Sequence, residues 1–381
     1  DSVQASRASW SQCPPFVDYP RILDYLRDEK IEFTCFDCSN APVGSLYLVN
    51  ICWFDSDTDY FQLMNPESRR RLQNRELKFV MMYFEADSSL HLQTTIFKLC
   101  AKHNINPLDV HVVLGNTMAS ITPNFHYFDD DEIIFQRSQL SQARPLLTWH
   151  DRPRSKKITL LSRVHKNWRA FFCSWYWHHN MHLDSYFSYR MIDQGYDSSN
   201  ESNPLYASVK TNATRLNVMN DFLSNAPFSA DGLTDSDHNY YGTRVDAHYQ
   251  DSYINCVLET HLSLHQDMPG VFITEKTWKP IAHAQPFVIL GTAYSLKHLK
   301  SLGYRTFDEI GLDESYDSIL DPTLRFHAVF DLISSIHNMS WKGLQSFNSS
   351  AKKIVEHNQM LYWSSKKPRL LKLFKDLTNV D

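Results

Sequence analysis

Short apolar runs alternate with amphipathic stretches along most of this chain, and no other feature restricts the possible folds as much. Residues 46–54, 77–84, 110–114 and 133–135 have the pattern of strands, and residues 90–103 carry apolar side chains at helical spacing. A helix between two such strands favours parallel pairing, because the crossover returns the chain to the same end of the sheet. The N-terminal part is therefore expected to be a parallel sheet covered by helices.

The same rhythm begins again after a polar segment rich in Pro, Arg and Lys at residues 150–157. A strand is expected at 158–161, a helix at about 168–178, and buried strands near 253–258 and 286–290. The chain of 381 residues also exceeds what one compact core usually holds. We therefore predict an α/β protein with two Rossmann-like lobes.

The polar segment at residues 150–157 sets the predicted boundary between the two lobes. Residues 1–155 are predicted to form the N-terminal lobe, residues 156–343 the C-terminal lobe, and residues 344–381 a closing helix with a basic tail. Asp321 before a proline is expected to start one helix of the second lobe, and Ser295 is expected to cap another.

The composition is that of a globular chain with no excess of one charge. Hydrophobic residues make up 43% and the formal net charge is −5, which gives no electrostatic reason to predict duplex binding. No stretch approaches the roughly 20 apolar residues that cross a bilayer, and the seven cysteines are dispersed, unlike a disulfide scaffold. We expect a cytoplasmic protein without a membrane span.

The segment at residues 255–287 carries the strongest chemical signal. A strand ends at Glu259, and a polar loop then leads to Thr274, Glu275 and Lys276 at the start of a helix. Transfer of a sugar from a nucleotide needs a group that holds the ribose and positive charge that neutralises the departing diphosphate. A carboxylate, a lysine and the N–H groups of a helix N-terminus meet these needs. These four residues are therefore predicted to bind a nucleotide-sugar donor.

This segment resembles the donor-binding signature of alpha-1,3-fucosyltransferases and related viral and bacterial glycosyltransferases. In that family a Phe-Glu-Asn strand end precedes a Tyr/Phe-x-Thr-Glu-Lys helix start and a Pro-Phe/Val strand. Glu259 matches the first Glu, residues 272–276 match the helix start, and Pro286 matches the following strand. The resemblance implies a GT-B fold with an interlobe cleft, a nucleotide held by the C-terminal lobe, and inverting transfer.

Two residues depart from the family pattern. Thr260 stands where the family usually has Asn. Pro280 falls within the first two turns of the expected helix, where it would remove a hydrogen bond and kink the helix, unless the helix starts later with Pro280 in its first turn. The donor sugar is therefore left open, with GDP-fucose as one candidate.

The resemblance extends upstream to a basic turn between a strand and a helix. The sequence at residues 162–169 is similar to the turn that contacts the pyrophosphate in the family. It implies that Arg163 and Arg169 bind phosphate. The alternative is that either arginine is a surface charge near a helix N-terminus.

The acceptor hydroxyl needs a general base on the N-terminal lobe. Glu85 follows the strand at residues 77–84, and ligands of parallel sheets gather at the carboxyl ends of strands. We predict Glu85 as this catalytic base. Asp55 and Asp57 are alternatives, and Glu85 could instead form a structural salt bridge.

No cofactor and no metal are expected, since the nucleotide sugar is itself the donor substrate. The acceptor is predicted to be a glycan or another hydroxyl compound, in the host cytoplasm if the protein is viral. A glycosyltransferase that acts on modified DNA bases stays open, although nucleic acid is not the favoured partner. A non-catalytic module that binds nucleotide sugars is the third interpretation.

Overall fold

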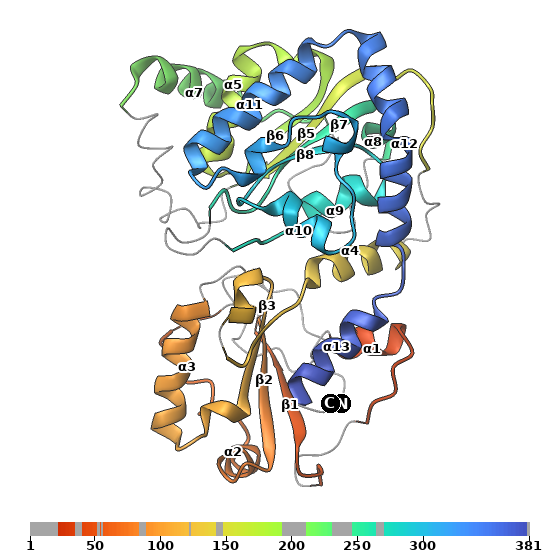
Figure 1. The fold of residues 1–381 in the computed structure, drawn as a ribbon. Coiled ribbons are helices and arrows are strands. Elements are labelled where there is room, and N and C mark those ends of the chain that lie inside the picture. The colour runs from red at the N-terminus through yellow and green to blue at the C-terminus, as the bar shows by residue number, and fades with distance from the viewer. Residues whose placement is uncertain are drawn as a thin grey trace. The chain divides into compact units, whose positions relative to one another are not determined.

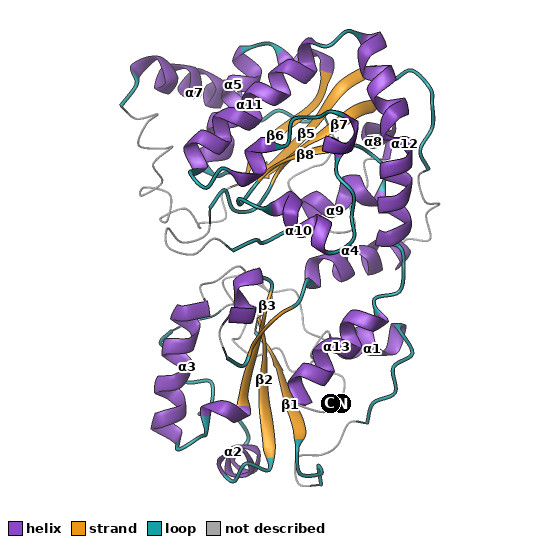
Figure 2. Ribbon diagram, viewed as in Figure 1, coloured by secondary structure: helices purple, strands orange, loops and turns teal. Residues whose placement is uncertain are grey.

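The computed structural model describes residues 22–34, 40–51, 54, 56–83, 89–121, 123–141, 148–192, 211–230, 246–263 and 270–378. The chain divides into two compact units (Figure 1). Unit 1 comprises Asp1–Ile133 and Ser365–Asp381, and unit 2 comprises Ile134–Ser364. Each unit contains a four-stranded parallel sheet with helices (Figure 2), so the predicted α/β fold with two parallel sheets is confirmed.

Unit 1 has the strand order β1-β2-β3-β4. Its strands are β1 (Ser45–Asn50), β2 (Leu77–Tyr83), β3 (Val110–Leu114) and β4 (Phe125–Tyr127). Its helices are α1 (Ile22–Asp28), α2 (Pro66–Gln73), α3 (Ser89–His103) and α13 (Lys367–Thr378), with the short 3-10 helices η2 (Pro107–Asp109) and η3 (Thr117–Ile121). The strands predicted near β1, β2 and β3 and the helix predicted at α3 are therefore found.

The strand predicted at residues 133–135 is wrong. These residues lie in α4 (Asp130–Ser141), which begins in unit 1 and ends in unit 2. The side chain of Asp129 accepts the Glu132 N–H at 3.2 Å and caps this helix. A short apolar run does not by itself distinguish a buried strand from a buried helical turn.

Unit 2 has the strand order β6-β5-β7-β8. Its strands are β5 (Lys156–Val164), β6 (Ser185–Ile192), β7 (Ser252–Leu258) and β8 (Phe287–Leu290). Its helices are α5 (Asn167–His178), α7 (Ala213–Asn225), α8 (Asp246–Gln250), α9 (Glu275–Ala282), α10 (Ser295–Ser301), α11 (Pro322–Asn338) and α12 (Trp341–Tyr362), with the 3-10 helices η4 (Met181–Asp184), η6 (Phe307–Ile310) and η7 (Ser315–Ser318). The strands and the helix predicted from residue 158 onwards are present.

Helix α9 is anchored in unit 2 by its packing on α12. The Trp278 ring is fully buried and lies 6.3 Å from the Tyr362 ring in a stacked arrangement. The Gln359 side chain donates a hydrogen bond of 2.7 Å to the carbonyl of Ala282, the last residue of α9. A buried aromatic pair contributes about 0.5–1.5 kcal/mol beyond the burial of its area. The middle and the C-terminal end of this short helix are therefore held by contacts distant in sequence.

The two predicted helix starts have different outcomes. Asp321 caps α11 as predicted, since its carboxylate accepts the N–H groups of Thr323 at 2.8 Å and Leu324 at 2.9 Å. Ser295 is not the N-cap of α10, because that position belongs to Tyr294. Within the described residues, no helix is long and apolar enough to cross a membrane.

Candidate functional site

The predicted donor residues gather at one edge of the sheet in unit 2. Strands β5 and β7 are parallel neighbours, so both end at the same edge. Helix α5 begins three residues after β5, and α9 follows the loop that leaves β7. The N-termini of both helices therefore lie at the carboxyl edge of the sheet, where aligned peptide dipoles favour a bound anion.

Glu259 lies directly after β7 and is completely buried. Its Oε1 accepts the Thr274 N–H at 3.1 Å and the Thr277 hydroxyl at 2.6 Å. Its Oε2 accepts the Thr274 hydroxyl at 2.6 Å and the Thr260 N–H at 3.0 Å. Four donors thus surround one carboxylate, which joins the end of β7 to the first turn of α9.

Gly291, directly after β8, makes room for this carboxylate. A Cβ at Gly291 would lie 3.0 Å from the Glu259 Cβ and 3.2 Å from its Cγ. Because Glu259 is held by four hydrogen bonds, it has little freedom to move away. A side chain at this position would therefore overpack the site.

Gly291→Ala is expected to lower the free energy of unfolding by about 1–3 kcal/mol, the usual cost of overpacking a fixed core position. Urea denaturation measures this change. Gly343→Ala is the matched control in the first turn of α12, because its Cβ would meet the Ser340 hydroxyl at 3.3 Å and otherwise only the Met339 side chain at 3.5 Å or more. Equal stability of the two variants would contradict the close packing of Gly291 on Glu259.

Lys276 and Glu275 form an ion pair at the start of α9. The Lys276 Nζ donates to the Thr260 hydroxyl at 3.0 Å, to the Thr274 hydroxyl at 3.1 Å and to a carboxylate oxygen of Glu275 at 3.0 Å. Burial would raise the pKa of Glu275, but Lys276, Lys279 and the nearby guanidinium of α5 outweigh it and hold that pKa well below its usual value. Glu275 is therefore an ionised carboxylate in a cationic environment.

Arg169 reaches the same place from the first turn of α5. Its side chain is buried, and its Nε donates to the Glu259 carbonyl at 3.2 Å, together with Nη2. Among the described residues, its Nη1 has no acceptor. Burial lowers the pKa of Arg169, while Glu259 and Glu275 act in the opposite direction. The arginine thus links α5 to the end of β7, and the N–H groups of its Nη1 are left as hydrogen-bond donors.

The other residues predicted for the donor site or for catalysis are Arg163, Glu85, Asp55 and Asp57. Arg163 is half-buried at the irregular end of β5, where the pairing with β6 shifts register. Glu85 and Asp55 lie outside the described residues, and Asp57 is exposed in the turn after β1. The roles predicted for Arg163 and Glu85 therefore stay predictions.

Four further residues at the site had no role predicted for them from the sequence. Thr260 and Thr277 supply two of the four hydrogen-bond donors to the Glu259 carboxylate. The Thr260 hydroxyl also accepts a hydrogen bond from Lys276. Lys166, in the N-cap position of α5, donates from Nζ to the Thr260 carbonyl at 2.7 Å. The hydroxyl of Ser162, near the end of β5, is buried and has no hydrogen-bond partner in the described part of the chain. A signal for the threonines was available, since Thr277 lies three residues after Thr274 and thus on the same helix face.

Helix α9 begins at Glu275, so Pro280 lies inside the helix and not in its first turn. Its ring removes a donor only near the end of the helix, because α9 stops at Ala282. The bond that it removes would have ended on the backbone carbonyl of Lys276, whereas the side-chain hydrogen bonds of Lys276 at the helix start are present.

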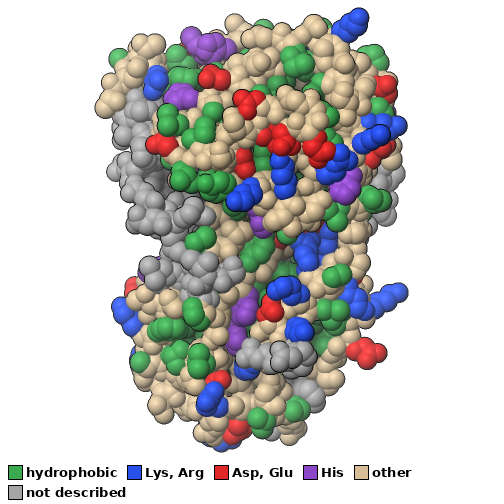
Figure 3. Space-filling model, viewed as in Figure 1, with side chains coloured by type: hydrophobic (Ala, Val, Ile, Leu, Met, Phe, Trp, Pro, Cys, Tyr) green, Lys and Arg blue, Asp and Glu red, His purple; other side chains and the backbone are tan. Residues whose placement is uncertain are grey.

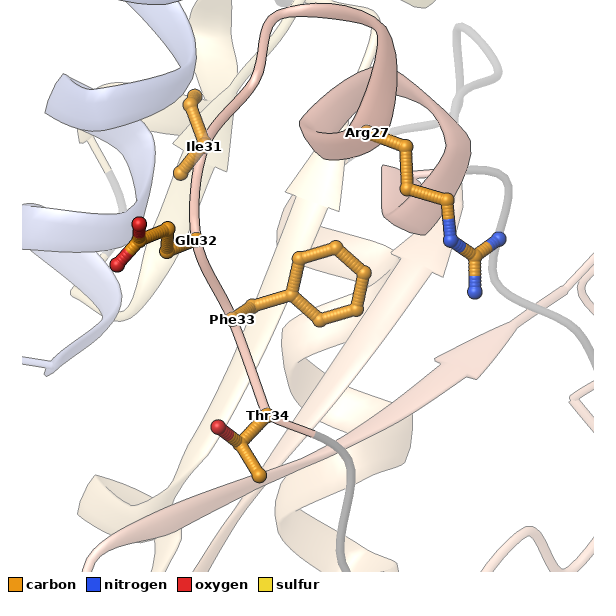
Figure 4. A pocket seen from close by; sticks show the side chains of 5 residues that line it. All are labelled: Arg27, Ile31, Glu32, Phe33 and Thr34. Atoms are coloured by element: carbon orange, nitrogen blue, oxygen red, sulfur yellow. The ribbon is translucent and has the colours of Figure 1, made fainter.

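A separate surface hollow of about 570 Å³ lies in unit 1. It is lined by Arg27, Ile31, Glu32, Phe33 and Thr34, and the Phe33 ring faces into it (Figure 4). None of the predicted donor residues lines it. In the part of the chain that the structure describes, no group of three or more His, Cys, Asp and Glu side chains has an arrangement that would hold a metal ion.

On the face of unit 2 seen in Figure 3, acidic and basic side chains are intermixed, without a broad patch of one sign.

Comparison of the chain with family models and with curated proteins gives no match.

Proposed function

We propose that unit 2 binds the diphosphate and ribose of a nucleotide sugar and that the protein is an inverting glycosyltransferase of the GT-B type. The observation that carries this proposal is the meeting of Arg169, Lys276 and Glu275 at the carboxyl edge of the sheet, beside two helix N-termini. Cationic donors and helix N-termini are suited to a diphosphate, and a carboxylate is suited to ribose hydroxyls. The resemblance of residues 272–276 to the fucosyltransferase signature supports the same assignment.

The hydrogen bonds of the site divide the roles between the two glutamates. The carboxylate oxygens of Glu259 already accept four donors from the protein, so its proposed role is to fix the start of α9. Among the described residues only Lys276 donates to the Glu275 carboxylate, which thus keeps acceptor capacity, so Glu275 is the proposed ribose ligand. Lys276 would exchange its bonds to threonine hydroxyls for charge-assisted bonds to phosphate, which are about twice as strong.

The proposed reaction is one displacement. The acceptor oxygen attacks the anomeric carbon, the bond from that carbon to the diphosphate oxygen breaks, and the hydroxyl proton passes to a carboxylate. Glu85 is the residue proposed to supply that carboxylate, because it follows the strand predicted at residues 77–84. Lys276 and Arg169 neutralise the charge that grows on the diphosphate, which is the largest electrostatic requirement of the step.

Lys276→Ala is expected to weaken binding of a nucleoside diphosphate by about 10–150-fold, since a hydrogen bond to a charged group contributes about 1.5–3 kcal/mol. Isothermal titration calorimetry with GDP and UDP measures this loss and identifies the base. The control is Lys297→Ala, because Lys297 is an exposed lysine in the first turn of α10.

Wild-type protein that binds neither GDP nor UDP, nor their sugar derivatives, would overturn the donor site. Equal affinity of the wild type and the Lys276 variant would place the site elsewhere. If GDP-fucose or UDP-glucose binds but is neither transferred nor hydrolysed with any glycan acceptor, the protein is a binding module and not a transferase.

A further inference from the structure

We infer that Arg325, on α11, is a positioning residue for the diphosphate site, an inference that rests on the function proposed above. Arg325 is 2% exposed and lies far along the chain from every predicted donor residue. It touches none of the groups assigned to ligand binding. Its hydrogen bonds hold the loops that leave β7 and β8, on either side of Glu259.

The guanidinium of Arg325 joins the loops that leave β7 and β8. Its Nε donates to the carbonyl of Gly291 at 2.9 Å, and its Nη2 donates to the carbonyl of Leu262. Its Nη1 donates to the carbonyls of Ile319 and, at 3.1 Å, Leu320. Because the guanidinium is planar, these bonds fix the separation of the two loops as well as their orientation.

Both loops act directly on Glu259. Leu262 lies three residues after Glu259, in the loop that also supplies Thr260. Gly291 lies against the Glu259 side chain, so close that an added Cβ would stand 3.0 Å away. Arg325 therefore holds both neighbours of the carboxylate that fixes the start of α9, and with it Glu275 and Lys276.

Among the residues that the structure describes, no carboxylate contacts the Arg325 guanidinium directly. Burial lowers the pKa of Arg325 to about 10, while Asp317 and Asp321 raise it from a distance. The side chain is thus charged at neutral pH, and burial of such a charge costs free energy that apolar packing would avoid. Its donors nevertheless all go to backbone carbonyls, which indicates that it orders the loops and not that it merely fills the core.

Arg154 offers a matched control within the same unit. It is 5% exposed, burial lowers its pKa to about 10, and its Nη1 donates to the carbonyls of Tyr249 and Ser252. Ser252 is the first residue of β7, whereas Glu259 follows the last. At about 3.3 Å per residue, Arg154 therefore acts roughly 20 Å away, at the other edge of the sheet.

The test compares Arg325→Met with Arg154→Met. Each variant is titrated calorimetrically with whichever nucleoside diphosphate, GDP or UDP, the wild-type protein binds, well below the melting temperatures of the variants. Both variants are expected to melt earlier than the wild type. Only Arg325→Met is expected to weaken diphosphate binding, by about tenfold or more, because misplaced binding groups lose affinity although each is still present. If either methionine variant fails to fold, Arg325→Lys and Arg154→Lys replace the pair, since one ammonium cannot hold two loops.

Free guanidinium at millimolar concentration is expected to restore part of the affinity of an Arg325→Ala variant and none of that of Arg154→Ala. Equal affinities of the Arg325 and Arg154 variants, or an unchanged dissociation constant after loss of Arg325, would overturn the inference while the proposed function stands. A wild-type protein that binds no nucleoside diphosphate would overturn the proposed function itself.

Discussion

Glu259→Ala is expected to lower the free energy of unfolding of unit 2 by about 3–5 kcal/mol and to abolish nucleoside diphosphate binding. The substitution leaves the buried donors of Thr260, Thr274 and Thr277 without their acceptor, and each unsatisfied donor costs about 1–3 kcal/mol before relaxation. Urea denaturation followed by tryptophan fluorescence is suited to this measurement. Seven of the nine tryptophans belong to unit 2, so the signal reports that unit.

Two variants show whether the effect comes from the buried carboxylate. Glu259→Gln keeps the shape but replaces one acceptor oxygen with a donor, so its loss of stability should lie between those of the wild type and the alanine variant. Asp308→Ala removes a half-exposed carboxylate that contacts Lys300 at 2.7 Å, and such a pair contributes at most about 1 kcal/mol. A Glu259→Ala protein as stable as Asp308→Ala would contradict the hydrogen-bonded arrangement of Glu259.

Three of the buried strands were predictable nearly to the residue. Strand β3 has the predicted limits, and β7 and β8 differ from them by one residue, because fully buried parallel strands are short apolar runs between polar segments. Local chemistry was also sufficient at Asp321, whose carboxylate caps the helix that begins with the next residue.

Contacts between distant residues limited the prediction elsewhere. Helix α10 is capped by Asp317, which follows the helix and accepts the N–H groups of Leu296 at 2.9 Å and Lys297 at 3.0 Å. Ser295 has the residue type of a cap, but its hydroxyl donates to the Thr292 carbonyl at 2.7 Å. No local pattern indicates a capping group that comes from about 20 residues further along the chain.

The candidate site shows the same limit. The sequence assembles Glu259, Glu275 and Lys276 into one site but does not say which carboxylate faces the protein and which faces a ligand. That difference depends on the path of the loop that returns Thr274 to the end of β7. Arg325 could not be connected to the site at all, because its acceptors in the loops after β7 and β8 lie 63 and 34 residues away.

The docking of α13 in unit 1 depends on another buried charge. Glu132, at the start of α4, is completely buried and accepts the Lys366 Nζ at 2.6 Å and also a donor of Arg369. The Lys366 side chain is 4% exposed, so burial lowers its pKa while Glu132 raises it. The segment before α13 is held in addition by Glu29, which accepts the Lys366 N–H at 2.6 Å.

Glu132→Ala is expected to lower the free energy of unfolding of unit 1 by about 3–5 kcal/mol, because it leaves the Lys366 ammonium buried without its counter-charge. Hydrogen exchange of the α13 amides measures the loss of docking directly. The double variant Glu132→Leu, Lys366→Met should recover most of the protection, since apolar side chains of similar volume often replace a buried ion pair without cost.

Asp376→Ala is the control, because its pair with Lys372 is exposed and contributes only about 0.3–0.5 kcal/mol. If Glu132→Ala exchanges no faster than this control, the buried ion pair does not hold α13, and the apolar face of Leu370, Leu373 and Leu377 is sufficient without it.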